Sequence, residues 1–235
     1  MRALRTAAAA LLLLLGMGPA VADQAPRAPQ WVNTVVRTPE GGYRQGNPDA
    51  PIKLIEYGSR TCPTCGRFAA EGVEPLRREW IASGKLSYEF RDYLVHGAPD
   101  LALALLNQCV PPQRFFPVLD AIFANQQAFD APLHRLMERA PQQVQAWQQL
   151  PPGQSAMRFA EALGMIAFMK RLGVPEAQSR RCLSDAALIE RIAKANADAA
   201  NVHGVRGTPS FFVNGRRVRA VSWDQLQPEL RAADS

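Results

Sequence analysis

The chain has 235 residues, of which 47% are hydrophobic, and a formal net charge of +6. This length fits one domain, or one domain with an insertion, that can bury an ample core. The basic residues are scattered, so the charge does not favour a nucleic-acid-binding protein. Four cysteines are too few for a small disulfide-stapled scaffold and indicate thiols with specific roles.

The first 22 residues have the pattern of an export signal. Two arginines precede an apolar run over residues 7–15, and an A-x-A cleavage pattern follows at residues 20–22. We therefore expect cleavage before Asp23 and export to the periplasm. The net charge would fall to +4, because this segment holds two arginines and no acidic residue. The alternative is an uncleaved membrane anchor, for which the apolar run is too short.

Strand and turn signals dominate the first half of the mature chain. Strands are predicted over residues 31–36, 52–57 and 86–95, where β-branched or alternating apolar residues occur. A stretch rich in glycine and proline between the first two strands indicates turns. A helix follows the second strand, and Gly72 and Pro75 predict a kink or break in it.

Helical periodicity replaces the strand pattern after residue 97. Apolar residues recur at helical spacing in several segments of residues 98–184, which predicts a helical insertion. The glutamine-rich stretch 142–149 is compatible with either a surface helix or a loop. Residues 23–97 and 185–235 would then form one α/β domain.

Strand character returns near the C-terminus. Residues 210–213 predict a strand, and Asn214-Gly215 is a strong signal for a two-residue hairpin turn. Val218 and Val221 are predicted to lie in the partner strand, and a helix closes the chain.

The pair Cys62 and Cys65 encloses Pro63 and Thr64, between an apolar strand and a helix. This spacing suits a redox-active dithiol, because the positive end of a helix favours a thiolate at the first cysteine. Thr61 is the candidate N-cap of that helix. The alternative is a zinc site, which would need a second Cys/His pair, whereas the other cysteines and the three histidines are dispersed.

Two further features favour the redox interpretation. Glu56 lies six residues before Cys62, where its carboxylate would point under the helix. A buried carboxylate has a raised pKa and can relay protons; the alternative is an exposed strand carboxylate. In residues 204–210, glycines and the Thr208-Pro209 pair indicate a sharp turn. A cis Thr208-Pro209 bond would fit there, although most X-Pro bonds are trans.

Together these motifs resemble the DsbA-like branch of thioredoxin-fold proteins. The segments that carry the resemblance are residues 46–51, 55–57, 62–65 and 204–215. The match covers most of the mature chain and is weaker over residues 131–153. It implies an α/β thioredoxin fold, with a central mixed sheet flanked by helices and an inserted α-helical domain.

The resemblance also implies catalytic roles. Cys62 would form the mixed disulfide with the substrate, and Cys65 would be the buried resolving thiol. Glu56 matches the family's acid beneath the active site. Pro209 matches its cis-proline, which packs against the disulfide and presents backbone to the substrate. Thr208, which precedes it, matches the residue that tunes reactivity and partner choice.

Pro63 and Thr64 would contact substrate beside Cys62, and Thr64 departs from the family pattern. The best-known oxidants of the family have histidine there, which helps to stabilise the thiolate, whereas threonine offers only a hydroxyl. Positive charge from Arg60 or Arg67 would compensate in part. We therefore predict a disulfide less oxidising than those of the family's strongest members.

Cys109 and Cys182 fall in the predicted helical block. Cysteines at similar places in some relatives resemble a second, structural disulfide, which export would allow. The alternative is two separate buried thiols that act as small hydrophobic residues.

The sequence thus predicts an exported thiol–disulfide oxidoreductase that donates its Cys62–Cys65 disulfide to cysteine-containing exported proteins. The resemblance implies a membrane redox partner of the DsbB type, and we expect a monomer that needs no metal or bound cofactor. One alternative is a reductase or isomerase on the same scaffold, although residues 23–45 are too short for a full dimerisation domain. The other is a protein that binds a metal through the two cysteines.

Overall fold

The computed structural model describes residues 30–235, so the predicted export signal lies outside the described residues. Six strands form one mixed sheet in the order β1-β2-β4-β3-β5-β6. Only β3 and β4 pair in parallel; the other neighbours are antiparallel. The strands are β1 (Val35–Arg37), β2 (Tyr43–Gly46), β3 (Ile52–Gly58), β4 (Leu86–Asp92), β5 (Ser210–Val213) and β6 (Arg216–Val218). The predicted α/β fold with a central mixed sheet is confirmed.

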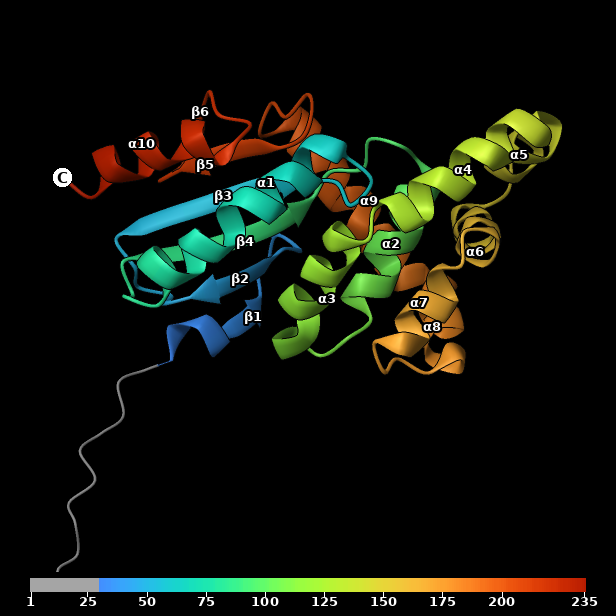
Figure 1. The fold of residues 1–235 in the computed structure, drawn as a ribbon, viewed down its shortest axis with the longest axis horizontal. Helices are drawn as coiled ribbons and strands as arrows, with labels where there is room; N and C mark the ends of the chain where they lie inside the picture. The colour runs from blue at the N-terminus through green and yellow to red at the C-terminus, as the bar shows by residue number, and fades with distance from the viewer. Residues whose placement is uncertain (1–29) are drawn as a thin grey trace, which may run out of the picture.

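Helices cover both faces of this sheet and gather at one end of it (Figure 1). They are α1 (Pro63–Pro75), α2 (Ala98–Gln108), α3 (Pro112–Ala124), α4 (Gln127–Arg139), α5 (Pro141–Gln148), α6 (Pro152–Ala162), α7 (Met165–Arg171), α8 (Glu176–Leu183), α9 (Ala186–Asn201) and α10 (Trp223–Ala233). The glutamine-rich stretch is therefore helical, as α5. Within residues 30–235, no helix combines the length and the apolar character needed to cross a membrane.

The central strand β3 is buried on both faces. Ile52 and Leu54 belong to a core cluster shared with α1, α3 and α10, whereas Ile55 and Tyr57 pack in a second cluster that includes residues of α9 and its C-terminal loop. Side chains alternate between the two faces of a strand. Glu56 therefore points to the α1 side, into apolar surroundings.

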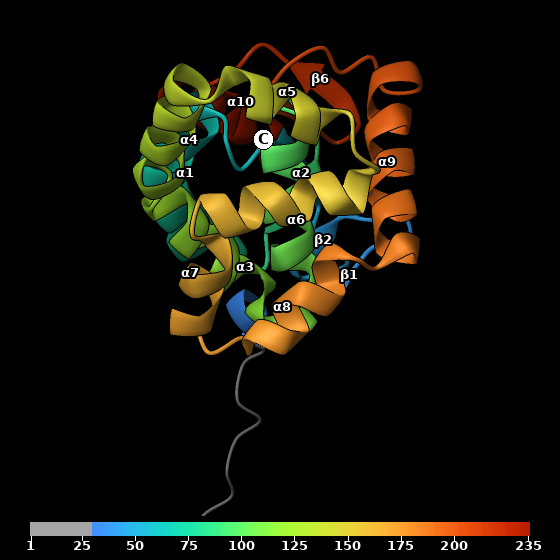
Figure 2. The same cartoon turned by 90° about the vertical axis from the view of Figure 1, so that its right-hand side faces the viewer.

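A separate core holds the helical region together. α2 is its centre, and every residue from Leu101 to Leu106 is buried because α3, α6, α8 and α9 surround this helix (Figure 2). α3 contributes Phe115 and Phe116 to the sheet core and Ile122 to the helical core. The boundaries at residues 98 and 184 remain predictions, since α3 packs into both cores.

The disulfide Cys109–Cys182 ties the end of α2 to α8. Its Cα atoms are 5.9 Å apart, and it links residues 73 positions apart in the sequence. The two cysteines come together because both helices pack into the helical core.

The predicted N-terminal strand is partly wrong. A 3-10 turn, η1 (Trp31–Asn33), occupies its first half, and only β1 is extended. β2 lies in the stretch expected to form turns, where the Tyr43 ring stacks on Phe115 at 3.8 Å. Strand β2 is therefore stabilised by a contact with α3, which no local signal indicates.

Two predicted strand ends are also corrected. β4 stops at Asp92. The Tyr93 N–H still donates to the Gly58 carbonyl oxygen of β3 at 3.0 Å, but the next amide leaves the sheet, since the Leu94 N–H donates to Asn196 Oδ1 at 2.7 Å. β6 ends at Val218, so Val221 lies outside it and is 47% exposed.

The helix after Cys62 changes its winding at Pro75, one of the two predicted positions. It passes at Pro75 from α1 into η2 (Leu76–Ile81), a π-helical segment. Proline lacks the N–H that continues α-helical bonding, which accounts for the change of winding. Gly72 instead allows close packing, since a Cβ there would lie 2.9 Å from the Phe68 ring and 3.1 Å from Trp223.

Candidate active site

The two cysteines lie at the start of α1, shortly after the end of β3. β3 ends at Gly58, a short turn follows, and Cys62 is the N-cap residue of α1, with Pro63 as its first helical residue. The prediction of Thr61 as N-cap is wrong. Its hydroxyl lies 2.8 Å from His96 Nδ1 and 3.1 Å from Ser59 Oγ, so it bonds away from the helix.

Cys62 has the environment of a thiolate. It is 8% exposed and is a free thiol, as is the fully buried Cys65. Hydrogen bonding from the Cys65 thiol is the largest cause that lowers the pKa of Cys62 to about 5, against the opposing effect of burial. A hydrogen bond from the Thr208 side chain and bonds from the backbone N–H groups of Cys65 and Thr64 lower this pKa further.

Cys65 has the opposite character. Burial raises its pKa well above the ordinary value, and the hydrogen bond to Cys62 and the charge of Glu56 act in the same direction. The pair is therefore divided between a stable thiolate at Cys62 and a protonated thiol at Cys65. Such a division suits one cysteine that reacts with partners and one that completes the exchange.

Glu56 is buried beneath the pair, with 1% of its surface exposed. The Tyr88 hydroxyl donates to Glu56 Oε2 at 2.6 Å, and no donor among the described residues reaches Oε1. Burial raises the pKa of Glu56 to about 8; the bond from Tyr88 lowers it, and the charge of Cys62 raises it further. At neutral pH the carboxyl is largely protonated and can exchange a proton.

The loop before β5 contacts Cys62. The Thr208-Pro209 peptide bond is cis, and the Cys62 thiol donates to the Thr208 carbonyl oxygen at 3.4 Å. β5 pairs antiparallel with β3, in the register Glu56 opposite Phe211. This pairing brings the loop to the C-terminal end of β3, although 146 positions separate Cys62 from Thr208.

Arg60 does not compensate for Thr64. Its side chain is fully buried, forms an ion pair with Asp92, and donates through Nε to Asn107 Oδ1 at 2.9 Å. Arg67 is exposed on α1. Neither arginine is among the main groups that lower the pKa of Cys62. The expected help from these positive charges is therefore not among the main causes of the shift, and the Arg60 side chain is engaged with Asp92.

Sequence reasoning missed the polar groups behind the active-site turn. Asp100 Oδ2 accepts from Ser59 Oγ at 2.6 Å, and Asp100 Oδ1 accepts from the Arg60 N–H at 3.2 Å. A signal was present, since Asp100 and Asn107 are polar positions flanking the apolar run of α2. Gln126 also reaches this turn, and no local pattern points to it.

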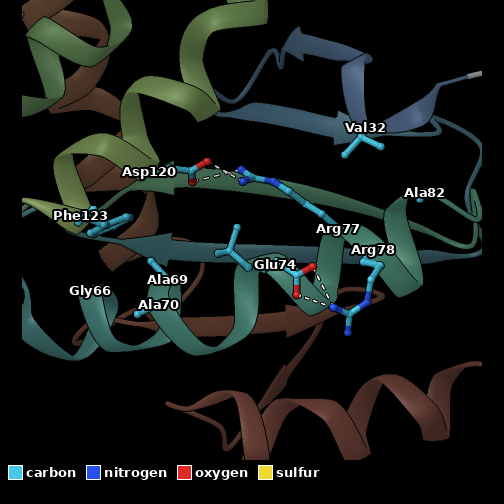
Figure 3. Close-up of a pocket in the computed structure, with 12 residues that line it drawn as sticks. Val32, Gly66, Ala69, Ala70, Glu74, Arg77, Arg78, Ala82, Asp120 and Phe123 are labelled. Atoms are coloured by element: carbon cyan, nitrogen blue, oxygen red, sulfur yellow. Dashed lines mark hydrogen bonds and ion pairs between the residues drawn. The ribbon is translucent and has the colours of Figure 1, made fainter. Parts of the chain in front are cut away.

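Two cavities are lined by chain neighbours of the cysteines. One of about 360 Å³ adjoins Thr61 and Pro63 and extends over Leu133, Met137 and Phe159 of the helical region. The other, of about 520 Å³, follows α1 away from the motif, and Figure 3 shows it. Its lining includes Gly66, Ala69, Ala70, Phe123 and the ion pair between Arg77 and Asp120.

The fold and the divided cysteine pair define a thiol:disulfide oxidoreductase, and comparisons with known proteins agree. The thioredoxin family model matches residues 38–231, so the chain belongs to this family. A Rickettsia bellii protein named "Putative protein-disulfide oxidoreductase" is 25% identical over 92% of this chain and 74% of its own length. Related Rickettsia proteins are longer, and this chain spans 58–60% of them.

Solved structures give the same fold. The crystal structure of protein-disulfide isomerase from Novosphingobium aromaticivorans is 31% identical, with a TM-score of 0.77, over 82% of this chain and 96% of that one. The alpha-DsbA1 of Wolbachia pipientis is 22% identical, with a TM-score of 0.57, over 81% of this chain and 88% of that one. The second likeness concerns the fold alone.

Proposed function

We propose that this oxidoreductase donates the Cys62–Cys65 disulfide to cysteine-containing exported proteins. The observation that carries the proposal is the lowered pKa of Cys62 beside the raised pKa of Cys65. A stable thiolate favours the reduced enzyme, so it makes the disulfide form a good oxidant. Because threonine stands at position 64 in place of histidine, we still expect this disulfide to be less oxidising than those of the family's strongest members.

The exchange proceeds in two thiolate attacks. A client thiolate attacks Sγ of Cys62, a client–Cys62 disulfide forms, and the Cys62–Cys65 bond breaks to leave Cys65 as the thiolate. A second client thiolate then attacks the client sulfur of this mixed disulfide. The client leaves oxidised, and Cys62 leaves as a thiolate, so two electrons pass from client to enzyme.

Glu56 supplies the proton that Cys65 takes up. Cys65 leaves as a thiolate in a buried setting that strongly favours its protonated form. Glu56 lies close enough to Cys65 for its charge to affect the thiol, and its raised pKa makes a proton available at neutral pH. Proton transfer from Glu56 to Cys65 would move the single buried negative charge from the thiolate, whose protonated form is strongly favoured, to the carboxylate, whose pKa is lower.

The surfaces around Cys62 suit a polypeptide client. Pro63 is exposed and Thr64 half-buried beside the reactive sulfur, while Thr208 and Pro209 bring backbone to its other side. The cavity next to Pro63 offers apolar walls for client side chains. These features support binding of an extended segment that contains a cysteine.

The proposed cellular compartment and redox partner rest on the sequence. The export pattern of residues 1–22 supports a periplasmic protein, and the family resemblance supports reoxidation by a membrane partner of the DsbB type. We further propose a monomer. In the described part of the chain, no group of three or more His, Cys, Asp or Glu side chains is placed to hold a metal ion. The metal-binding alternative therefore gains no support.

A disulfide isomerase is the second candidate function. One observation favours it: the solved structure with a TM-score of 0.77 is described as a protein-disulfide isomerase. An isomerase or reductase would be kept reduced in the cell, whereas a donor would be kept oxidised. Alkylation of Cys62 and Cys65 in freshly lysed cells separates the two functions.

The decisive experiment replaces Cys65 by alanine. In Cys65→Ala, the Cys62 thiolate can still attack the disulfides of oxidised clients and of the redox partner, and no Cys65 thiol is present to release the mixed disulfide, so clients and redox partner should accumulate as covalent complexes. Cys62→Ala is the matched control and should trap nothing. The proposed mechanism is wrong if Cys65→Ala traps nothing while the wild-type protein oxidises dithiol peptides.

A further inference from the structure

A side chain from a distant helix corner holds the active-site turn. Gln126 lies between α3 and α4, and its Nε2 donates to the carbonyl oxygens of Arg60 and Cys62, each at 2.9 Å. Cys62 is the N-cap of α1, so these hydrogen bonds hold in place the turn that carries the proposed attacking thiol. In residues 30–235, no second donor reaches the Arg60 carbonyl oxygen.

Gly66 provides the space for this amide. A Cβ atom at position 66 would lie 2.1 Å from Gln126 Oε1 and 2.7 Å from Gln126 Cδ, which is closer than non-bonded atoms approach. Gly66 does not have a positive φ angle. The close approach of Gln126 therefore accounts for a glycine inside α1, where alanine would favour the helix.

The backbone at Gln126 is itself held in place. Its carbonyl oxygen accepts from the N–H groups of Phe129 at 2.9 Å and Asp130 at 3.0 Å, and its N–H donates to the Phe123 carbonyl at 3.4 Å. The amide is thus presented to the turn from a corner that is bonded to the helices on both sides.

We propose that Gln126 is a positioning residue for Cys62 and that Gly66 admits it; the inference rests on the proposed role of Cys62. Backbone N–H groups of Thr64 and Cys65 stabilise the Cys62 thiolate while the first turn of α1 keeps its orientation. By bonding the carbonyl groups of Arg60 and Cys62, Gln126 fixes that orientation. Without it, the buried Arg60 carbonyl loses its donor and the turn would rearrange.

The test uses Gln126→Ala, Gly66→Ala and the double variant. The reduced proteins are titrated by the ultraviolet absorbance of the thiolate. In each single variant we expect the acid dissociation constant of Cys62 to fall about tenfold, which is a pKa increase of about one. The double variant should show no larger change than Gln126→Ala, because the methyl group added at position 66 then occupies the vacated space.

Asn125→Ala is the matched control from the same corner. Asn125 Nδ2 donates to the Ala121 carbonyl at 2.8 Å, within α3, and not to the turn. This variant should titrate like the wild type. Circular dichroism and thermal unfolding report on folding, which a merely structural role would change without moving the titration midpoint.

The outcomes separate the two proposals. If Gln126→Ala and Gly66→Ala titrate like the wild type, the positioning role is wrong, whatever their thermal stability. If the effects add in the double variant, the shared contact is wrong. If wild-type Cys62 itself titrates at an ordinary thiol pKa, the proposed role of Cys62 fails, and the positioning role fails with it.

Discussion

Ionisation of Cys62 should stabilise the reduced protein at neutral pH. The pKa of Cys62 is about 5 in the folded protein, against an ordinary value of 9.0. A lowered folded pKa contributes stability that is fully present above the unfolded pKa and is lost as pH falls through the folded pKa. The stability of the reduced protein relative to Cys62→Ala should therefore decrease as the pH is lowered from 7 to 4.

The size of this effect follows from the pH interval. At pH 7 only the interval from 5 to 7 contributes, and at about 1.4 kcal/mol per pH unit the ceiling is about 3 kcal/mol. Cys62 remains 8% exposed, so water screens part of the interaction. We expect a measured difference of about 1–3 kcal/mol.

The assay is urea unfolding of both reduced proteins at pH 7 and pH 4. Other titrating groups affect the two proteins alike, except Glu56 and Cys65, whose pKa values depend on Cys62, so the difference between the unfolding free energies reports the ionisation of Cys62 together with its coupling to these two groups. Titration of the thiolate absorbance in the wild type should give the same midpoint. An equal difference at the two pH values would refute the account of a stable thiolate at Cys62.

Three further predictions concern the surroundings of the site. Glu56→Gln should gain stability relative to the wild type as pH rises from about 5 to 8, because the raised pKa of Glu56 destabilises the folded wild-type protein over that window. Urea unfolding at several pH values measures this gain. Parallel pH profiles of the two unfolding free energies would contradict the prediction. Replacing both Cys109 and Cys182 by serine should cost about 4 kcal/mol, the loop-closure value for a separation of 73, and unfolding that matches the wild type would exclude this. Asp92→Ala should cost about 3–5 kcal/mol by leaving the Arg60 charge buried and unpaired, whereas a loss below about 1 kcal/mol would show that Arg60 finds another partner.

Elements with strong local patterns were predictable. The strand before the cysteines, the helix after them and the hairpin at Asn214 all follow from apolar periodicity and turn residues, because these signals act over a few neighbouring positions. β2 was not predictable, since its residues resemble a turn and the Phe115 ring of α3 packs on Tyr43. The end of β4 was missed for the same reason, because Asn196 takes the Leu94 N–H out of the sheet.

The sequence by itself determined the chemistry of the protein. The spacing of Cys62 and Cys65 at the start of a helix indicates a redox-active dithiol, and the acid six residues before Cys62 is the proposed proton donor. Tertiary structure decided how this chemistry is tuned. Burial raises the pKa values of Cys65 and Glu56. The pairing of β5 with β3 brings Thr208 to Cys62, and Arg60 forms an ion pair with Asp92. These effects arise from contacts between residues far apart in the chain, and local sequence patterns do not record them.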